Sequence, residues 1–483
     1  MVGGMNLPHL IAPKADPKAG ADAGPLERAF AALREQLDLT LDYPQEAKAE
    51  AEQAATSVAL PDRDETAVPY FTIDPPGSMD LDQAMCLERD GDGYRVRYAI
   101  ADVPAYVRPG GALDDETRQR GQTIYLPDAR VPLHPKVLSE DAVSLLADEV
   151  RSAFVWDIKL SSLAEATSSE VYRAKVRSTA RLDYEHVQQQ IDGGSAPEGL
   201  ALLKEIGELR IALEAKRGGA NLPMPEQEVS KGDDGTYQLT FRPQLPSEEW
   251  NAQISLLTGM AAADLMLQAK VGILRTMPAP EQKAIDRFRR QATALGVEWP
   301  ADQQYGDFIR GLDRSNPKHL ALIHDATSLF RGAGYTPFDG QEPEDRIQAA
   351  VAAPYAHVTA PLRRLVDRFG LVVCEAVSQG GQVPDWVREA LPTLPDIMSR
   401  TDQKASQAEH GCTDAVEAAV LAPRVGETFA AYVVDTDEKG ITVQLVDLAV
   451  TAKAEGSAEP GAEVRVKLSE ANIEEHRVRF ELV

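Results

Sequence analysis

Hydrophobic residues near the start of the chain recur with a helical period. Phe30, Leu33 and Leu37 are spaced three and four positions apart, which indicates an amphipathic helix. Pro44 interrupts this pattern, and an Ala- and Glu-rich helical stretch follows it up to Ala55. The residues before this helix, 1–25, are rich in Gly, Pro, Ala and Lys, and we expect a mobile tail there.

The pattern changes to short apolar runs and turn residues from residue 68 to about residue 163, and becomes mainly helical after residue 183. An Asp-Gly-Asp-Gly sequence at residues 90–93 separates two apolar runs and predicts a β-hairpin. The predicted elements are strands at 68–73, 81–87 and 94–103, helices at 198–216 and 251–274, and a hairpin within 228–243.

Short strands return at the end of the chain, at residues 429–434, 441–446, 464–468 and 478–482. They predict a small all-β barrel of the OB type. The whole pattern therefore predicts an α+β protein in three parts. These are a mobile tail with a helical segment at 1–66, a large α+β domain at 67–422 and a reduced OB-like domain at 423–483.

The balance of charge limits how the protein could bind other molecules. The chain has 50 Lys and Arg against 76 Asp and Glu, a formal net charge of −26. This charge counts against a protein that binds nucleic acid over a basic outer surface. It leaves room for an enzyme whose Lys and Arg line an interior channel, with the excess acid outside that channel.

Other features exclude several classes of protein. The three cysteines are widely spaced and form neither a disulfide framework nor a zinc cluster, which favours a reducing, cytoplasmic compartment. No stretch reaches about 18 consecutive apolar residues and no apolar leader is present, so we expect no membrane span and no signal peptide. The sequence has no Walker loop and no Gly-x-Gly-x-x-Gly, and we expect no organic cofactor.

Three carboxylates lie within nine residues directly after a predicted strand. Asp74, Asp80 and Asp82 flank a Pro-Pro-Gly turn that can fold the later two acids back towards the first. A hard cation such as Mg²⁺ or Mn²⁺ would offset their repulsion and could activate water for phosphodiester hydrolysis. A solvated acidic turn is one alternative. A calcium loop is another, although Met85 lies where its closing Glu would be.

The acidic segment resembles a motif of the RNB family of 3′→5′ exoribonucleases, the ribonuclease II and ribonuclease R group. Further blocks resemble that family in the same order, and together they span about residues 70–410. They include Ile-Ala-Asp-Val-Pro-Ala-Tyr-Val at 100–107, Arg-Gly-Gln-Thr-Ile-Tyr-Leu-Pro at 120–127, Val-Pro-Leu-His-Pro at 131–135 and Tyr-Ala-His-Val-Thr-Ala-Pro-Leu-Arg-Arg at 355–364. The resemblance implies a large RNB catalytic domain with a central channel, in a short form without the paired N-terminal cold-shock domains.

The resemblance also implies hydrolysis of single-stranded RNA from its 3′ end to 5′-mononucleotides, with Mg²⁺ or Mn²⁺ as cofactor. By position, Asp74, Asp80, Asp82 and Gln83 would form the metal site, while Asp80, Asp82 and Arg363 would be catalytic. Gln83 replaces the family's fourth Asp, so we expect one metal to be held tightly and a second weakly.

Two alternative functions remain open. The missing cold-shock domains and the acidic surface would suit a nuclease restricted to short RNAs. Gln83 would suit a catalytically silent family member that binds RNA or a protein partner.

Two further residues, Tyr125 and Glu409, match positions that face RNA in the family, and Arg364 lies on the face next to Arg363. Tyr125 would stack on the terminal nucleotide, Glu409 would read a 2′-hydroxyl, and Arg364 would hold a backbone phosphate. By pattern alone, Tyr125 could be a core strand residue, Glu409 an exposed helix residue and Arg364 part of an exposed basic face.

The surroundings of Arg363 also lead to a structural expectation. A helix capped by Thr359, with Pro361 at its first position, would place Arg363 in the first turn, where a phosphate is favoured. The alternative is an ion pair between Arg363 and Asp367 on a surface helix. Arg368 would lie on the neighbouring face and could hold a phosphate or be exposed.

The C-terminal unit is weakly equipped for RNA. Residues 423–483 contain seven Lys and Arg against twelve Asp and Glu, with few aromatic residues. A strong single-strand platform needs a positive groove and stacking rings. We therefore expect this unit to bind RNA weakly or to close the mouth of the channel.

Overall fold

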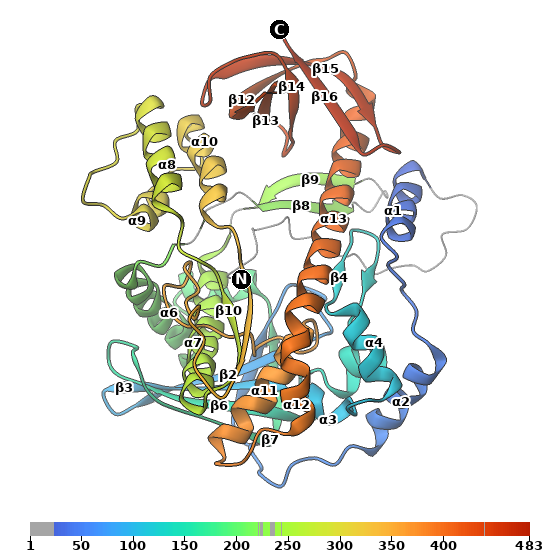
Figure 1. Ribbon diagram of the computed structural model, residues 1–483, viewed down its shortest axis with the longest axis vertical. Helices are drawn as coiled ribbons and strands as arrows, with labels where there is room; N and C mark the ends of the chain where they lie inside the picture. The colour runs from blue at the N-terminus through green and yellow to red at the C-terminus, as the bar shows by residue number, and fades with distance from the viewer. Residues whose placement is uncertain (1–23, 221, 223–225, 232–236, 243, 439) are drawn as a thin grey trace.

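The computed structural model describes residues 24–483, with gaps at 221, 223–225, 232–236, 243 and 439. The predicted mobile tail falls almost entirely outside the described residues, as does the turn of the hairpin expected within 228–243. The strands of that hairpin, β8 (Glu226–Lys231) and β9 (Tyr237–Arg242), pair antiparallel as predicted. Two closed β-barrels, with helices between them, form the framework of the described chain (Figure 1).

The first barrel closes five strands in the order β1-β2-β3-β6-β7. They are β1 (Tyr70–Ile73), β2 (Gln83–Asp90), β3 (Gly93–Ala101), β6 (Val150–Leu160) and β7 (Ala166–Leu182). β2 and β3 form the predicted hairpin, in which Asp90 lies opposite Gly93. An added Cβ at Gly93 would lie 2.0 Å from the Leu160 carbonyl oxygen, so this turn requires glycine.

Three helices share one apolar core with the first barrel. They are α6 (Glu198–Arg217), α7 (Pro246–Ala269) and α11 (Leu365–Ser378). α6 agrees with the predicted stripe at 198–216. The helix predicted at 251–274 is wrong at both ends, because Lys270 adopts a left-handed φ of 58° and terminates α7. The residues after it form β10 (Val271–Thr276), which pairs antiparallel with β11 (Gly334–Asp339).

Short elements connect these parts. They are α3 (Val103–Tyr106), α4 (Ala112–Arg120), β4 (Ile124–Tyr125), β5 (Arg130–Val131), η1 (Leu138–Ala142), α5 (Tyr184–Asp192), η2 (Thr327–Leu329), α12 (Asp385–Ala390), η3 (Leu391–Thr393) and η4 (Ala422–Arg424). Five of them, β4, β5, η1, α5 and η2, contribute residues to the cavity described below.

The long helix α13 (Leu394–Leu421) runs from the side of the first barrel to the C-terminal barrel (Figure 1). α1 (Pro25–Gln36) packs against it. The approach is close, because an added Cβ at Gly411 would lie 2.8 Å from Leu33 Cδ2. Pro44 separates α1 from α2 (Gln45–Ser57), as predicted, and α2 packs against α4.

The C-terminal barrel closes its strands in the order β12-β13-β14-β16-β15. They are β12 (Thr428–Asp437), β13 (Gly440–Leu445), β14 (Thr451–Glu455), β15 (Glu463–Asn472) and β16 (Arg477–Leu482). This barrel confirms the predicted OB-like unit and, with the mixed domain before it, the predicted fold class. β14 was not predicted, because its sequence Thr-Ala-Lys-Ala-Glu has no large apolar side chain and buries Ala454 alone.

A small helical layer lies beside the C-terminal barrel. It consists of α8 (Gln282–Ala294), α9 (Tyr305–Arg310) and α10 (Pro317–Ala326). The rings of Trp299 and Phe308 stack in its core at 4.4 Å, and α10 packs on β12. Among the helices that the structure describes, none combines the length and the apolar character needed to cross a bilayer.

Candidate active site

The three predicted acids lie in the loop between β1 and β2 and face a cavity of about 1760 Å³. Asp74 follows β1 directly, and Asp82 immediately precedes β2. Ser144 fixes the loop between them, because its Oγ donates to the Met79 carbonyl at 2.6 Å and accepts the Leu81 N–H at 2.9 Å. The structure therefore brings the acids to one cavity wall, as their spacing predicts.

Asp82 is the most firmly positioned of the three acids. It is 4% exposed, and its Oδ1 accepts the Leu362 N–H at 2.7 Å. Its Oδ2 lies 3.7 Å from Nε of Arg363. Burial raises the pKa of the Asp82 carboxyl well above its ordinary value, although Arg363 and the Leu362 N–H act in the opposite direction.

Asp74 carries a buried oxygen without a partner. Its Oδ2 makes no hydrogen bond to any described residue. Burial raises the pKa of this carboxyl to about 7, and the charge of Asp80 adds to the rise, while Arg363 and Arg181 oppose it. The group therefore lies where an added positive charge would be favourable.

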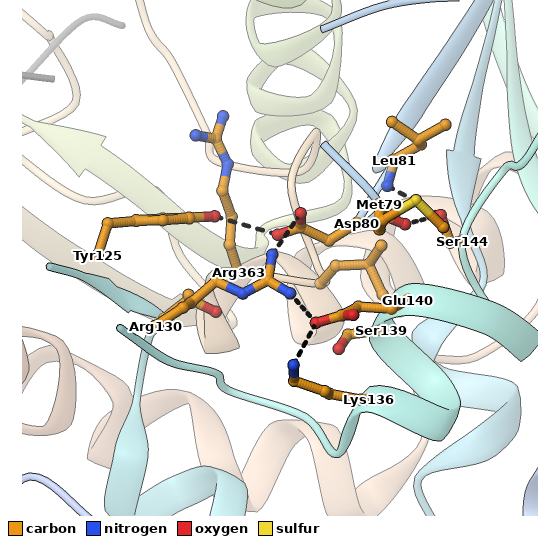
Figure 2. A network of polar contacts seen from close by, with 12 residues as sticks. Met79, Asp80, Leu81, Tyr125, Arg130, Lys136, Ser139, Glu140, Ser144 and Arg363 are labelled. Atoms are coloured by element: carbon orange, nitrogen blue, oxygen red, sulfur yellow. Dashed lines mark hydrogen bonds and ion pairs between the residues drawn. The ribbon is translucent and has the colours of Figure 1, made fainter. Parts of the chain in front are cut away.

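Asp80 is bound by protein groups on both oxygens. Arg130 donates from Nη1 to Oδ1 at 2.6 Å, and the Tyr125 hydroxyl donates to Oδ2 at 3.2 Å. Arg130 also forms an ion pair with Glu140, which Lys136 Nζ approaches at 3.6 Å. Figure 2 shows this chain of contacts along one side of the acidic loop.

Gln83 is the first residue of β2 and links the acidic loop to the segment before α11. Its Nε2 donates to the carbonyl of Thr359. The side chain lines the cavity, but it brings no charge and its amide nitrogen is already engaged. An Asp at this position could not donate this hydrogen bond.

Arg363 lies in a turn, which contradicts the predicted helix N-terminus. α11 begins at Leu365, and Arg364 occupies its cap position with an extended backbone. Asp367 organises this turn, because its Oδ1 accepts the Ala360 N–H at 2.7 Å. The Arg363 side chain is 40% exposed and lines the cavity beside the acids.

The other two arginines of this segment make internal ion pairs. Arg364 donates from Nε and Nη2 to the two oxygens of Asp367, each at 2.8 Å. The alternative pair between Arg363 and Asp367 is therefore not formed. Arg368 is 1% exposed and binds Asp114 and a backbone carbonyl, so it lies neither on an exposed face nor on a phosphate-binding one.

Tyr125 and Glu409 line the cavity from two elements that are far apart in the sequence, β4 and α13. Tyr125 ends β4, and the neighbouring Thr123 N–H donates to the Arg363 carbonyl at 2.9 Å, which holds the strand beside the arginine. Tyr125 is thus a wall residue and not a core residue. Glu409 projects from α13 into the same cavity, and burial raises its pKa to about 8.

Comparison with known proteins identifies the fold and its two parts. Residues 62–373 match the RNB domain, which is about two thirds of the chain. This chain belongs to the RNB domain family. Residues 427–483 match the C-terminal S1 domain of RNase II-type exonucleases, which agrees with the closed second barrel.

Curated relatives are identical to this RNB protein at somewhat more than a quarter of the aligned positions. Ribonuclease R of Escherichia coli (strain K12) is 27% identical over 451 residues, which cover 88% of this chain and 52% of the relative. Exosome complex exonuclease RRP44 homolog A of Arabidopsis thaliana is 29% identical over 318 residues, or 62% of this chain and 33% of the relative. The chain spans about half the length of the ribonuclease R that it matches.

Solved structures share the fold at lower identity. The apo form of Mycoplasma genitalium RNase R superposes with a TM-score of 0.84 at 19% identity, over 95% of this chain and 78% of that chain. Yeast Ssd1, described as a pseudonuclease, superposes with a TM-score of 0.72 at 15% identity, over 92% of this chain and 57% of that chain. The likeness in fold therefore extends over almost the whole chain and includes both the RNB part and the C-terminal S1 part.

The charge of the cavity differs from the expectation that excess acid lies outside it. Eleven acidic side chains line the cavity against seven Lys and Arg. The basic ones are Lys48, Arg130, Lys136, Arg181, Arg242, Arg363 and Arg364. Since Arg130, Arg242 and Arg364 already pair with Asp80, Glu248 and Asp367, much of this positive charge is compensated within the protein.

Two of the three acids of this RNB site, Asp74 and Asp82, are suited to hold a divalent metal, whereas Asp80 is already engaged by Arg130. Among the residues that the structure describes, no cluster of three His, Cys, Asp or Glu side chains is already arranged around one point. The partnerless Oδ2 of Asp74 and the buried carboxylate of Asp82 are nevertheless the hard oxygen donors that Mg²⁺ and Mn²⁺ prefer. Asp80 would have to share its oxygens between the metal, Arg130 and Tyr125.

The sequence analysis missed Arg130 and Glu140, which change the state of Asp80. Arg130 lies between two recognised blocks, in a two-residue strand with no periodic pattern. Asn251 was also missed, although its Nδ2 donates to the Tyr184 hydroxyl at 3.1 Å on the cavity wall. The one sequence signal for Arg130 is its position five residues after Tyr125, which was already a candidate site residue.

Proposed function

We propose that this RNB protein is a metal-dependent 3′→5′ exoribonuclease that releases 5′-mononucleotides from single-stranded RNA. The observation that carries the proposal is the placement of Asp74 and Asp82 beside Arg363 on the wall of one large cavity. Two buried carboxylates that lack full compensation and a partly exposed guanidinium are the groups that a metal-assisted phosphodiester hydrolysis needs.

The metal would be Mg²⁺ or Mn²⁺, held by Asp74, Asp82 and, once it is free, Asp80. The Gln83 carbonyl oxygen could contribute as a neutral donor or orient a water. When bound, such an ion acts as a Lewis acid and makes a coordinated water easier to deprotonate. The chain's own contribution is to keep Asp82 fixed through the Leu362 N–H and close to Arg363.

Arg363 would grip the phosphate that is cut. Its guanidinium lines the cavity, and it always carries its charge. Two parallel N–H donors match the spacing of phosphate oxygens and stabilise charge that develops as the bond breaks. Arg364 would support this role, because its bidentate pair with Asp367 fixes the turn and leaves Nη1 for a neighbouring phosphate.

Tyr125 and Glu409 would act on the terminal nucleotide. A tyrosine ring stacks on any base, which suits an enzyme without sequence preference. Burial raises the pKa of Glu409 to about 8, and the protonated form that this favours could both donate and accept a hydrogen bond with a 2′-hydroxyl. That contact would favour RNA over DNA. The known relatives named above, ribonuclease R and RRP44, support the choice of RNA as substrate.

A second candidate is a catalytically silent RNA-binding protein. Gln83 is anchored to Thr359, and Asp80 is neutralised by Arg130, so the structure offers fewer free acids than the motif contains. The likeness to a fold described as a pseudonuclease makes this candidate worth an explicit test.

The test uses the full chain with single-stranded RNA labelled at its 5′ end, in Mg²⁺ and separately in Mn²⁺. We expect progressive shortening from the 3′ end with release of 5′-mononucleotides, and none from a matched DNA strand. Binding without release under either metal would contradict the nuclease and favour the silent protein. Release from short strands alone would favour the oligoribonuclease alternative.

A further inference from the structure

Asp80 differs from the other two acids because a cation binds it directly. Arg130 Nη1 lies 2.6 Å from Oδ1, and the two side chains are 18% and 12% exposed. The Tyr125 hydroxyl takes the second oxygen at 3.2 Å. Both oxygens of Asp80 are therefore engaged, whereas Asp74 Oδ2 is buried without a hydrogen-bond partner among the described residues.

A single short hairpin delivers both groups to Asp80. Tyr125 of β4 and Arg130 of β5 are cross-strand partners, so their side chains stand next to each other. Arg130 is tethered from its other amine to Glu140 of η1 (Figure 2). Because Glu140 holds one side of the guanidinium, Arg130 can release Asp80 and remain at the cavity wall.

The same wall is open to an anion. Asp80, Tyr125, Arg130, Lys136 and Glu140 all line the cavity. Lys136 is 71% exposed and adds a second cation beside Arg130. A phosphate group that enters here meets Arg130 and Lys136 beside the carboxylates of Asp80 and Glu140. It can compete with Asp80 for Arg130, because phosphate accepts bidentate hydrogen bonds from arginine as carboxylate does.

We infer that Arg130 is a positioning residue that holds Asp80 away from the metal until an RNA phosphate draws the guanidinium off. The inference rests on the proposed function, since it assumes that RNA and a divalent cation occupy this cavity. In the RNA-free protein, Arg130 occupies Oδ1 and repels a nearby divalent ion. In the RNA-bound protein, Arg130 binds the phosphate and Asp80 becomes a ligand.

This arrangement couples RNA binding to metal binding. Coupling between two ligands is reciprocal, so RNA must raise metal affinity by the factor by which the metal raises RNA affinity. The same coupling bears on Gln83, which brings no charge to the site. All three carboxylates, Asp74, Asp80 and Asp82, become metal donors only when the substrate is present. The protein would then hold its metal weakly at rest and tightly on RNA.

The test measures Mn²⁺ affinity directly, from the electron paramagnetic resonance signal of free Mn²⁺, on the full chain. Titrations are made with and without a single-stranded oligonucleotide that carries a cleavage-resistant 3′-terminal linkage. The variants are Arg130→Gln and Arg130→Met, which remove the charge and keep much of the side-chain volume. Lys159→Gln is the control, because it removes one exposed Lys charge from a position that does not line the cavity.

In the wild type, we expect the oligonucleotide to raise Mn²⁺ affinity at least about fivefold, the lower end of typical couplings. Either Arg130 variant should bind Mn²⁺ at least about fivefold more tightly without RNA and show reduced coupling. Lys159→Gln should leave both the RNA-free Mn²⁺ affinity and the coupling unchanged.

An unchanged or lower Mn²⁺ affinity in a folded Arg130 variant would overturn the inference. So would a wild type without coupling, or one in which an uncharged methylphosphonate strand couples as strongly as the charged strand. These outcomes are separate from the proposed activity. Coupling without RNA hydrolysis would contradict the nuclease alone, and hydrolysis without coupling would contradict the Arg130 switch alone.

Discussion

The two sides of the acidic loop carry the same side chain in opposite electrostatic situations. Asp74 and Asp82 are buried with incomplete compensation, and burial raises the pKa of both. Asp80 is six residues after the first and two before the second, yet Arg130 and Tyr125 take both of its oxygens. On one side of the loop the nearest cation, Arg363, stays 3.7 Å from Asp82, whereas on the other side Arg130 binds Asp80 directly at 2.6 Å.

This difference shows that a carboxylate's place in a motif does not determine its chemical state. Desolvation penalises a lone charge, so Asp74 and Asp82 favour a proton or a metal ion. A direct ion pair removes that need, so Asp80 gains little from a metal until Arg130 leaves. The following changes test this division, from the largest expected effect to the smallest.

Asp82→Asn removes the central charge of the uncompensated side and should have the largest effect. Asn can still accept the Leu362 N–H, so we expect the fold to persist while mononucleotide release falls at least about 10³-fold. Release is measured as single-turnover decay of end-labelled RNA, with thermal unfolding and RNA affinity as checks. Activity within tenfold of wild type would show that Asp82 does not act in catalysis.

Arg363→Lys tests whether the cation facing that side works through its shape. Lys keeps the charge but not the bidentate fork, so we expect turnover to fall on the order of 10²-fold with a smaller loss of RNA affinity. Arg181→Lys is the control, because Arg181 lines the same cavity and is partly exposed. Equal losses in both variants would assign Arg363 to general attraction and not to the reacting phosphate.

The sequence was sufficient for the larger features because they rest on repeated local patterns. The Asp-Gly-Asp-Gly sequence at 90–93 between two apolar runs predicts the β2–β3 hairpin, and the apolar stripe at 198–216 predicts α6. The helix at Arg363 could not be predicted correctly, because Thr359 and Pro361 resemble a cap while Asp367 accepts the Ala360 N–H from seven residues ahead. That contact is set by tertiary packing.

The ion pair of Asp80 with Arg130 could not be predicted from the sequence for the same reason. Arg130 and Asp80 are 50 positions apart, and their contact depends on the way β4 and β5 fold against the acidic loop. Arg368 gives a similar lesson, since its partner Asp114 lies 254 positions away. Local spacing predicts which groups exist, whereas charge compensation depends on pairs that only the fold brings together.

The raised pKa of Asp74 predicts a pH effect that belongs to the uncompensated side. A carboxyl whose pKa rises from 3.8 to about 7 on folding holds its proton in the folded state, so metal-free stability should fall as pH rises between these values. The slope from this group is at most about 1.4 kcal/mol per pH unit. Metal affinity should fall by up to about tenfold per unit below pH 7, because the cation needs the ionised form.

Thermal unfolding at pH 5.5 and pH 8, with and without Mg²⁺, measures this effect. Asp74→Asn is compared in parallel, because other buried acids also titrate. We expect the wild type to lose more stability than the variant on going to pH 8, and Mg²⁺ to reverse that loss in the wild type alone. Identical pH profiles for the two proteins would mean that Asp74 is ionised throughout this range.

Gln83→Asp adds a fourth carboxylate and should have the smallest net effect, because its gain and its cost oppose each other. The new charge should strengthen binding of a second metal. The variant also loses the hydrogen bond to Thr359 and places a carboxylate against that carbonyl oxygen, a cost of about 1 kcal/mol in unfolding free energy. We expect turnover at saturating Mg²⁺ to rise a few-fold while the melting temperature falls.

Gln83→Glu, which carries the charge on the longer side chain, is the matched control. If Gln83→Asp gains turnover only when combined with Arg130→Gln, the ion pair at Asp80 limits the reaction more than the missing fourth acid does.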